Sequence, residues 1–442
     1  MTTPSNREIW SIAGPIMLSL LAQNIVGVTD TAFLGRVGEV ELGASAIGGV
    51  FYLILYMVGF GFTTGVQILV ARRFGEKKYT DIGRIFDNSF YFIGLYSLLI
   101  TAVIYFFGSS VLRLFISSDA IFQASSEFLR FRVLGLFFAI ATLLFRSFYT
   151  GISFTKYLSI SAGIMAWLNV ILDYLLIFGH GGFPKMGIQG AGIASSISEV
   201  SALLFFIWIT AGNGRLKKYQ LFRLVKPDLK IIRKTLSISI FVMMQFVLSF
   251  GSWFVFFMIV EKMGERPLAI SNIIRSIYIF LMIPGWALGS VASTLVSTAL
   301  GEGKPESVMP IIFKMVKFSF LALTAVILMA LLFPHFVISI YTNNTSLAGA
   351  TVSSYYIILG ALAVFSIMSI FFNGVLGTAN TKTSLLIEAI TLSAYLGFTW
   401  LIAVHLKYEI EWVWMAEYVY FGLIGLLSLW YLMKGNWREK RI

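Results

Sequence analysis

The sequence contains no cysteine and only three histidines among its 442 residues. The lack of cysteine excludes disulfide bonds, thiol chemistry, Cys-ligated zinc and iron–sulfur clusters. Charged residues are also scarce, at 12% of the chain, against about 25% in a soluble domain. Because 58% of the residues are apolar, a soluble fold could not bury this much apolar surface. The composition therefore predicts a polytopic membrane protein.

Twelve apolar stretches are long enough to cross a bilayer as helices. They fall near residues 9–35, 42–71, 88–108, 125–150, 157–179, 187–211, 235–261, 268–300, 310–333, 351–376, 383–406 and 411–433. The first stretch does not resemble a cleaved signal peptide, because it carries Gln23, Asn24 and Asp30 and no small-residue cleavage pattern follows it. We therefore expect an all-α fold of 12 transmembrane helices.

Lysine and arginine are distributed unevenly between the two sides of these spans. With a cytoplasmic amino terminus, 23 of the 33 basic residues fall on the inner side and 8, Arg132 among them, on the outer side. This bias predicts both termini in the cytoplasm and a basic loop, residues 212–234, near anionic lipid headgroups. The net charge of +12 is then explained by a basic cytoplasmic face, and no nucleic-acid partner is expected.

An internal repeat relates the two halves of the chain. Residues 41–78 align without a gap to residues 267–304, with eleven identities. The identities include a Gly-Glu-x-Lys motif that begins at Gly75 and again at Gly301. Composition bias is a poor explanation for matched loop motifs.

The interval that separates Gly75 from Gly301 also separates two Gly-x-x-x-Thr-Lys loops, which begin at Gly151 and Gly377. We therefore predict two six-helix lobes, residues 1–211 and 235–442, related by a pseudo-two-fold axis along the membrane normal. Two similar lobes suit alternating access, which favours a transporter over a membrane enzyme.

Acidic residues inside the apolar spans are the strongest functional candidates, because a charge in the bilayer core costs ~2.5–3.5 kcal/mol on insertion scales. Asp30 shares a helix face with Gln23 and Gly27, and Asp173 shares one with Asn169. Two carboxylates that face one low-dielectric pocket could share a proton, or bind Na⁺ with Asn169 as a further oxygen ligand. Alternatively, each acid snorkels or is satisfied by the backbone.

Three further carboxylates lie in the apolar spans. Glu199 either joins the same pocket or faces the other lobe. Glu388 and Glu417 lie near the ends of their spans, where snorkelling to the interface is the simpler explanation.

Other candidates concern substrate and movement. Arg275 either lines a central cavity or pairs with an acid at the outer rim, Glu261 or Glu265. Further candidates for a substrate cavity are Met17, Asn24, Met243, Met244 and Tyr278. Candidates for a hinge are Pro15, Gly27 and Pro284.

Four segments resemble the multidrug and toxic compound extrusion (MATE) family, and most closely its DinF-like branch. They are VTDTAFLGRVGEVELGASAIGG (28–49), ILVARRFGEKK (68–78), NVILDYLLIFG (169–179) and MGIQGAGIASSISE (186–199). The resemblance covers essentially the whole chain. It implies a V-shaped transporter of two six-helix lobes that exports compounds by antiport with H⁺ or Na⁺.

The resemblance also implies roles for particular residues. The family's coupling-ion residues fall on Asp30, Asn169 and Asp173, with Ser195 in place of a threonine. A tyrosine of the family's proton relay is Phe128 here, so one hydroxyl is missing. The resemblance implies a monomer in a bacterial inner membrane, no cofactor beyond the coupling ion, and amphipathic, cationic substrates.

Two rival functions compete with antiport. A flippase for lipid-linked oligosaccharides would need a strongly cationic cavity for pyrophosphate, and only Arg275 and Arg146 offer charge of that sign. A membrane-embedded enzyme is disfavoured because His180, His335 and His405 lie near span ends without metal-ligand spacing.

Overall fold

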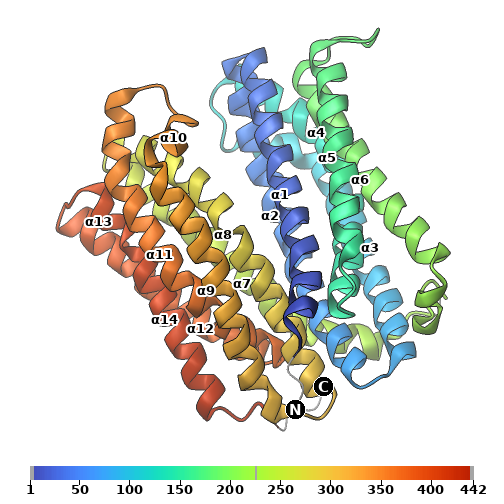
Figure 1. The fold of residues 1–442 in the computed structure, drawn as a ribbon. Helices are drawn as coiled ribbons and strands as arrows, with labels where there is room; N and C mark the ends of the chain where they lie inside the picture. Colours follow the sequence, from blue (N-terminus) through green and yellow to red (C-terminus); the bar gives the residue numbers. More distant parts are fainter. Residues whose placement is uncertain (1–3, 224–225, 439–442) are drawn as a thin grey trace. The chain divides into compact units, whose positions relative to one another are not determined.

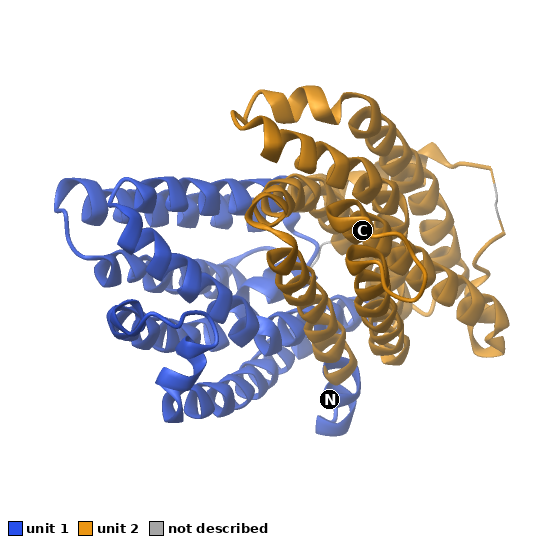
Figure 2. Ribbon diagram, turned by 90° about the horizontal axis from the view of Figure 1, so that it is seen from above, with its two compact units in different colours: residues 1–13, 244–442 blue, residues 14–243 orange. Residues whose placement is uncertain are grey.

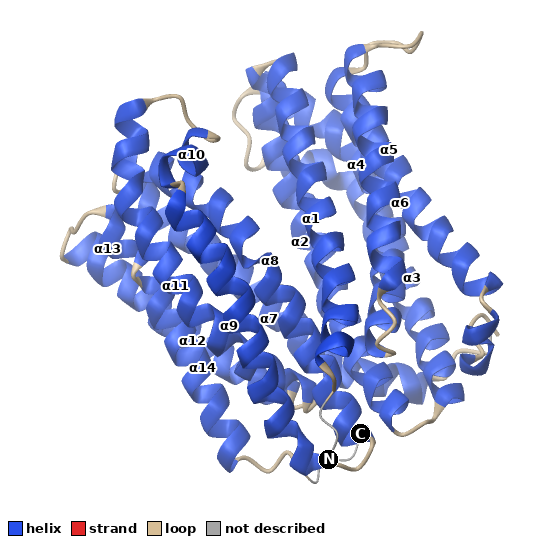
Figure 3. Ribbon diagram, viewed as in Figure 1, coloured by secondary structure: helices blue, strands red, loops and turns tan. Residues whose placement is uncertain are grey.

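The structure, a computed structural model, describes residues 4–223 and 226–438. All regular secondary structure in this part of the chain is helical (Figure 3). Twelve segments are long and apolar enough to cross a membrane (Figure 1), which confirms the predicted fold class. The predicted lobes and loop also include residues 1–3, 224–225 and 439–442, which lie outside the described residues.

The helices follow one another with short connections. The first half contains α1 (Asn6–Val37), α2 (Glu39–Gly75), α3 (Tyr79–Arg113), α4 (Asp119–Gly151), α5 (Lys156–Phe178), α6 (Gly187–Gly212) and the 3₁₀ turn η1 (Gly214–Tyr219). The second half contains α7 (Leu229–Glu261), α8 (Glu265–Gly301), η2 (Pro305–Ser307), α9 (Val308–Leu332), α10 (Pro334–Ser339), α11 (Thr345–Gly377), α12 (Thr381–Trp400), η3 (Leu401–His405), α13 (Ile410–Trp414) and α14 (Ala416–Lys434).

Most helices are longer than the apolar stretches that predict them. The clearest case is α3, which covers Tyr79–Arg113 although its apolar stretch covers only 88–108. Its first turns carry polar residues such as Asp81 and Arg84, which hydropathy excludes from a span although they are compatible with a helix. The twelfth span is divided into α13 and α14 at Met415.

The chain forms two compact units (Figure 2). Residues 14–243, orange in Figure 2, are called the first unit here, and residues 1–13 with 244–442, blue in Figure 2, are called the second unit. The boundaries fall within α1 and α7, whereas the predicted lobes meet in the loop 212–234. The start of α7 packs on α2 in the first unit, where Ser239 Oγ donates to Phe62 O at 2.9 Å. A Cβ atom added at Gly61 would lie 2.7 Å from Met243 Cα, so glycine permits this close approach.

The loop between the predicted lobes is held against α3. The carboxylate of Asp87 accepts bonds from the backbone N–H groups of Phe222 and Arg223, each at 3.1 Å. Leu216 and Tyr219 of η1 are buried. This part of the basic loop is therefore packed and capped, although the sequence predicts a solvated connection.

The repeated loop motifs adopt the same backbone turns in both units. Lys77 and Gly303, which occupy equivalent positions of the repeat, have φ values of 59° and 71°. Ser153 and Ala379, a second equivalent pair, have φ values of 57° and 64°. Because left-handed backbone is unfavourable for residues other than glycine, its recurrence at matched positions indicates a shared local structure.

Each Gly-Glu-x-Lys motif also contains an ion pair. Lys78 Nζ lies 3.0 Å from Glu76 Oε2, and Lys304 Nζ lies 2.6 Å from Glu302 Oε2. The motif therefore combines a helix end, a left-handed residue and a short-range salt bridge. This combination explains why glutamate and lysine recur together at this spacing.

Two glutamates predicted to snorkel are instead buried in the second unit. Glu388 is 1% exposed and Glu417 is 3% exposed. Glu388 Oε1 accepts from Ser249 Oγ at 2.7 Å and from Tyr420 Oη at 2.8 Å. The snorkelling prediction is wrong for both, because hydrogen bonds from neighbouring helices satisfy these carboxyl groups inside the unit.

Glu417 connects three helices of the second unit. Tyr278 of α8 donates to Glu417 Oε2 at 2.9 Å, and Tyr395 of α12 lies 3.3 Å from Glu417 Oε1. Replacing Glu417 by alanine should leave two buried hydroxyls without an acceptor, each at a cost of about 1–3 kcal/mol. We expect a lower melting temperature of the purified protein for Glu417→Ala and a smaller loss for Glu417→Gln, which keeps an acceptor. Equal losses of melting temperature in the two variants would contradict the role of Glu417 as a hydrogen-bond acceptor.

Candidate functional site

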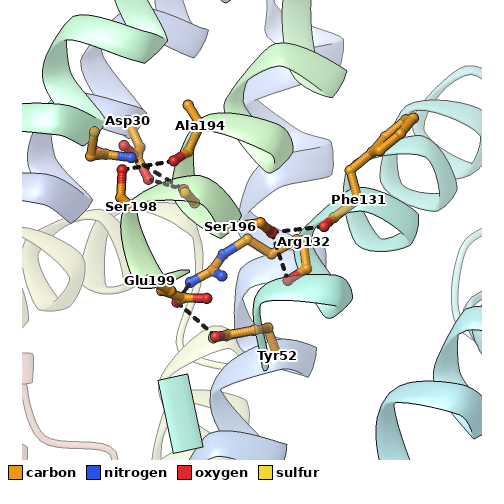
Figure 4. Close-up of polar contacts among 10 residues, drawn as sticks. Asp30, Tyr52, Phe131, Arg132, Ala194, Ser196, Ser198 and Glu199 are labelled. Atoms are coloured by element: carbon orange, nitrogen blue, oxygen red, sulfur yellow. Dashed lines mark hydrogen bonds and ion pairs between the residues drawn. The ribbon is translucent and has the colours of Figure 1, made fainter. Parts of the chain in front are cut away.

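The candidate site lies in the first unit, where α1, α5 and α6 meet. Small residues allow α6 to approach its neighbours closely. A Cβ atom at Gly190 would lie 2.8 Å from the backbone carbon of Leu176 in α5, and one at Gly192 would lie 3.0 Å from Phe128 O in α4. The next turns of α6 carry Ser195 and present Glu199 to the surrounding helices (Figure 4).

Asn169 connects the two aspartates predicted to bind the coupling ion. With its amide nitrogen turned toward them, Asn169 donates to Asp30 Oδ1 at 3.0 Å and to Asp173 Oδ2 at 3.3 Å. Ser195 Oγ lies 3.5 Å from Asp30 Oδ2 and 3.4 Å from the Asn169 amide. Four residues from three helices, far apart in the sequence, thus form one polar cluster.

This cluster is largely shielded from solvent. Asn169 and Asp173 are 0% exposed, and Asp173 Oδ1 has no hydrogen-bond partner among the described residues. The two carboxyl groups contact the same amide nitrogen of Asn169, and two ionised carboxylates this close together would repel strongly. One proton shared between them would relieve the repulsion and supply the missing donor.

The structure does not bring three other residues of the first unit into this cluster. The side-chain amide of Gln23 donates to Ser19 O at 2.8 Å, and that of Asn24 donates to Leu20 O at 2.9 Å. Both amides are therefore bonded to their own helix one turn back. Phe128 packs in a small apolar core beside Ala44 and Ile188, so the missing tyrosine hydroxyl is replaced by apolar packing.

Glu199 belongs to a second polar cluster, one helical turn from Ser195. Its Oε1 accepts from Arg132 Nη2 at 2.7 Å and from Tyr52 Oη at 2.8 Å. The Arg132 guanidinium also lies over the Tyr52 ring, with Cζ 3.7 Å from the ring centroid. Figure 4 shows these side chains converging from α2, α4 and α6.

Arg132 is therefore an interior residue, and its assignment to the outer loops is wrong. It lies thirteen positions after Asp119, the first residue of α4, which is about 20 Å along the helix. Its side chain is only 16% exposed. The signal was present in the sequence, because the predicted span 125–150 already includes position 132.

The substrate and hinge candidates are dispersed over both units. Arg275 lies 4.9 Å from the Phe257 ring centroid, and none of the ion pairs among the described residues involves it. Tyr278 is committed to Glu417, Met17 and Met243 are half-buried, and Met244 is exposed. The helices α1 and α8 continue without interruption through Pro15, Gly27 and Pro284. The predicted cavity and hinge roles stay predictions.

Comparison with known proteins agrees with the internal repeat. The family model MatE matches residues 15–175 and again residues 241–401. The second match begins and ends the same number of residues after the first match as Gly301 follows Gly75 in the sequence. The two family matches and the loop motifs therefore describe the same repeat.

Several curated bacterial proteins are similar in sequence. The chain is 23% identical to "Probable multidrug resistance protein NorM" of Thermotoga maritima, over 99% of this chain and 94% of that protein. It is 26% identical to "Multidrug resistance protein NorM" of Burkholderia vietnamiensis, over 81% of this chain and 77% of that protein. The match to a relative from Agrobacterium fabrum, 26% identical, covers 65% of this chain and 62% of the relative.

Solved structures share the fold. A MATE protein crystallised with MaL6 superimposes with a TM-score of 0.89 at 17% identity, over 96% of this chain and 95% of that one. A transporter of the MOP superfamily from Pyrococcus furiosus gives a TM-score of 0.89 at 18% identity, over 98% of this chain and 96% of that one. The DinF-like branch stays a prediction, but the family model covers most of the sequence, and the chain belongs to the MATE family of transporters.

Proposed function

We propose that this protein is a secondary active multidrug exporter, which expels amphipathic, cationic compounds in exchange for protons bound at Asp30 and Asp173. The observation that carries the proposal is the pair of carboxyl groups bridged by the Asn169 amide, of which Asp173 is fully buried. The names of the NorM relatives support multidrug export. A transporter needs no organic cofactor for this exchange, and one chain with two repeated halves can complete the cycle as a monomer.

The donors around the pair favour a proton over a sodium ion. Hard cations such as Na⁺ bind several oxygen ligands at once. The Asn169 amide turns N–H groups toward both aspartates, and its oxygen therefore points away from the space between them. A proton needs only one carboxylate oxygen, and Asp173 Oδ1 is available for it.

In the proposed cycle both aspartates are ionised before the proton binds, and the pair then shares one proton and one remaining negative charge. Binding of the proton relieves the repulsion between the two carboxylates and changes the hydrogen bonds that connect α1, α5 and α6. The proton and the substrate must each prefer a different conformation of the transporter, since only differential affinity can shift the equilibrium. We place both termini in the cytoplasm of a bacterial cell, because of the basic loops on that side.

The interior arginines argue against a flippase for pyrophosphate-linked lipids. A pyrophosphate site needs cationic groups that are free to bind the anion. Arg132 is paired with Glu199 at 2.7 Å, and Arg275 lies over the Phe257 ring. Arg146 of α4 is in none of the ion pairs among the described residues, and a single free arginine in this unit does not make the strongly cationic site that pyrophosphate needs.

Uptake into energised inverted vesicles, in which an exporter moves its substrate inward, tests the proposal. A fluorescent organic cation is the probe, and the proton and sodium gradients are collapsed separately. Transport that stops only when the proton gradient is removed supports the proposal. Transport that stops only when the sodium gradient is removed would show that the coupling ion is Na⁺ and not H⁺. If no cation moves in the wild type, the substrate class is wrong, and anionic or lipid-linked compounds become the next probes.

A further inference from the structure

We propose that Arg132 is an internal counter-cation for the Asp30–Asp173 pair, which stabilises the two carboxylates after their proton has left and is otherwise held by Glu199. This inference rests on the proposed proton exchange at that pair. It concerns a step that any such exchanger must complete, because the empty site would otherwise contain two adjacent charges in a medium of low dielectric constant.

The first observation is that the Arg132–Glu199 pair is incompletely satisfied. Only Arg132 Nη2 and Glu199 Oε1 are joined, at 2.7 Å. Arg132 Nη1 and Glu199 Oε2 are both buried without a hydrogen-bond partner. A guanidinium can bind a carboxylate with two parallel bonds, so a pair that uses one bond leaves a donor for another acceptor.

The second observation is that the cluster of Arg132, Glu199 and Tyr52 adjoins the aspartate pair. The Arg132 guanidinium interacts electrostatically with Asp30 and Asp173. The two clusters are joined by one turn of α6, since Ser195 contacts Asp30 and Glu199 contacts Arg132. A small rotation of this side chain could exchange one carboxylate partner for another without exposing the charge to lipid.

The third observation comes from the repeat. Tyr52 and Tyr278 occupy equivalent positions of the repeat, and each donates to a buried glutamate. Tyr52 donates to Glu199 on α6 at 2.8 Å, and Tyr278 donates to Glu417 on α14 at 2.9 Å. In the second unit that glutamate, Glu417, is completed by the hydroxyl of Tyr395. Position 358, which corresponds to Arg132, is isoleucine. The tyrosine–glutamate contact is thus common to both units, whereas the arginine occurs only beside the aspartate pair.

The backbone around Arg132 is held by α6. Ser196 Oγ donates to Phe131 O at 2.8 Å and lies 3.4 Å from Arg132 O (Figure 4). A Cβ atom at Gly135, one turn further along α4, would lie 2.9 Å from Ser196 Cα. The arginine therefore has a fixed backbone, and only its side chain needs to change partner.

The titratable and charged groups that surround Arg132 come from several helices. They are Asp30 on α1, Tyr52 and Tyr56 on α2, Asp173 on α5 and Glu199 on α6, with Arg146 on α4 beside Tyr56. On α3, Tyr105 is engaged by Arg130 at 3.2 Å. Among these groups Glu199 is the anion that competes with the aspartate pair for Arg132.

The test measures the proton occupancy of the pair directly. Difference infrared spectroscopy of the purified protein follows the carbonyl stretch of protonated carboxylic acids, assigned by its loss in Asp30→Asn, as pH is varied. Arg132→Gln removes the counter-cation, so the pair should hold its proton at about tenfold lower proton concentration. Glu199→Gln frees Arg132 for the pair, so about tenfold higher proton concentration should be needed.

Further variants separate this role from a structural one. The double variant Arg132→Gln/Glu199→Gln should titrate like Arg132→Gln, because Glu199 acts on the pair through Arg132. Arg132→Lys keeps the positive charge and should titrate near the wild type. The exposed pair Arg113–Asp119, joined at 2.6 Å, supplies control variants Arg113→Gln and Asp119→Asn, which should not shift the titration. Each variant is used only after size-exclusion chromatography shows a folded monodisperse protein.

The outcomes distinguish this inference from the proposed function. If Arg132→Gln and Glu199→Gln shift the titration of the aspartate pair in the same direction, or if neither variant shifts it, the role of Arg132 is overturned. Either result leaves proton-coupled export intact. Opposite shifts in a protein that exports no cation would support the role of Arg132 and refute the substrate class instead.

Discussion

Asp30→Asn and Asp173→Asn are each expected to lower ion-driven export by about 100-fold. Asparagine keeps the shape of aspartate but cannot exchange a proton, so the site becomes permanently neutral at that position. The proton gradient then cannot be coupled to movement of the substrate. Uptake of the fluorescent cation into energised inverted vesicles measures the loss.

The control for these variants is Asp119→Asn, which neutralises an exposed carboxylate of the same unit. It should export at the wild-type rate. The amount of each protein in the membrane is measured in parallel, so that lost expression is not mistaken for lost coupling. An Asp30→Asn protein whose export still responds to the proton gradient would refute the site.

Gly61→Ala and Gly65→Ala are expected to lower the melting temperature by about 5 °C or more. A Cβ atom at these positions would meet backbone atoms of α7, 2.7 Å from Met243 Cα for Gly61 and 2.8 Å from Ser239 Cα for Gly65. Backbone cannot move aside as a flexible side chain does, so α2 and α7 must separate. Thermal unfolding of the purified protein in detergent checks the prediction.

Gly49→Ala on the same helix is the matched control. A Cβ atom there meets nothing within 4 Å, and alanine favours a helix over glycine by about 1 kcal/mol. The melting temperature of this variant should stay the same or rise. If all three variants behave alike, the close approach of α2 and α7 does not limit stability.

Local sequence was sufficient to predict a feature where the structural role of a residue type does not depend on contacts with other helices. Apolar stretches identified the twelve helices, and the motifs at Gly75 and Gly301 identified the repeat, because a helix end with a left-handed residue constrains sequence in the same way wherever it occurs. Asp30 and Asp173 were found because ionisable residues are costly in apolar helices.

Sequence was misleading where the partner of a polar group lies on another helix. Glu388 and Glu417 resemble snorkelling residues by their position along a span, but hydroxyls from other helices bond them inside the second unit. Arg132 was counted on the outer side although it lies within the predicted span 125–150, and the position of Glu199 beside it cannot be read from helix periodicity.

Composition and local spacing therefore predicted the class of protein, the number of helices, the repeat and the two acidic residues. These features follow from composition and from local spacing, which each segment carries on its own. Two features are visible only in the tertiary structure. Asn169 bridges both aspartates, and Arg132, Glu199 and Tyr52 form a second cluster. Those contacts join residues up to 147 positions apart, and they depend on how closely small residues allow the helices to approach one another.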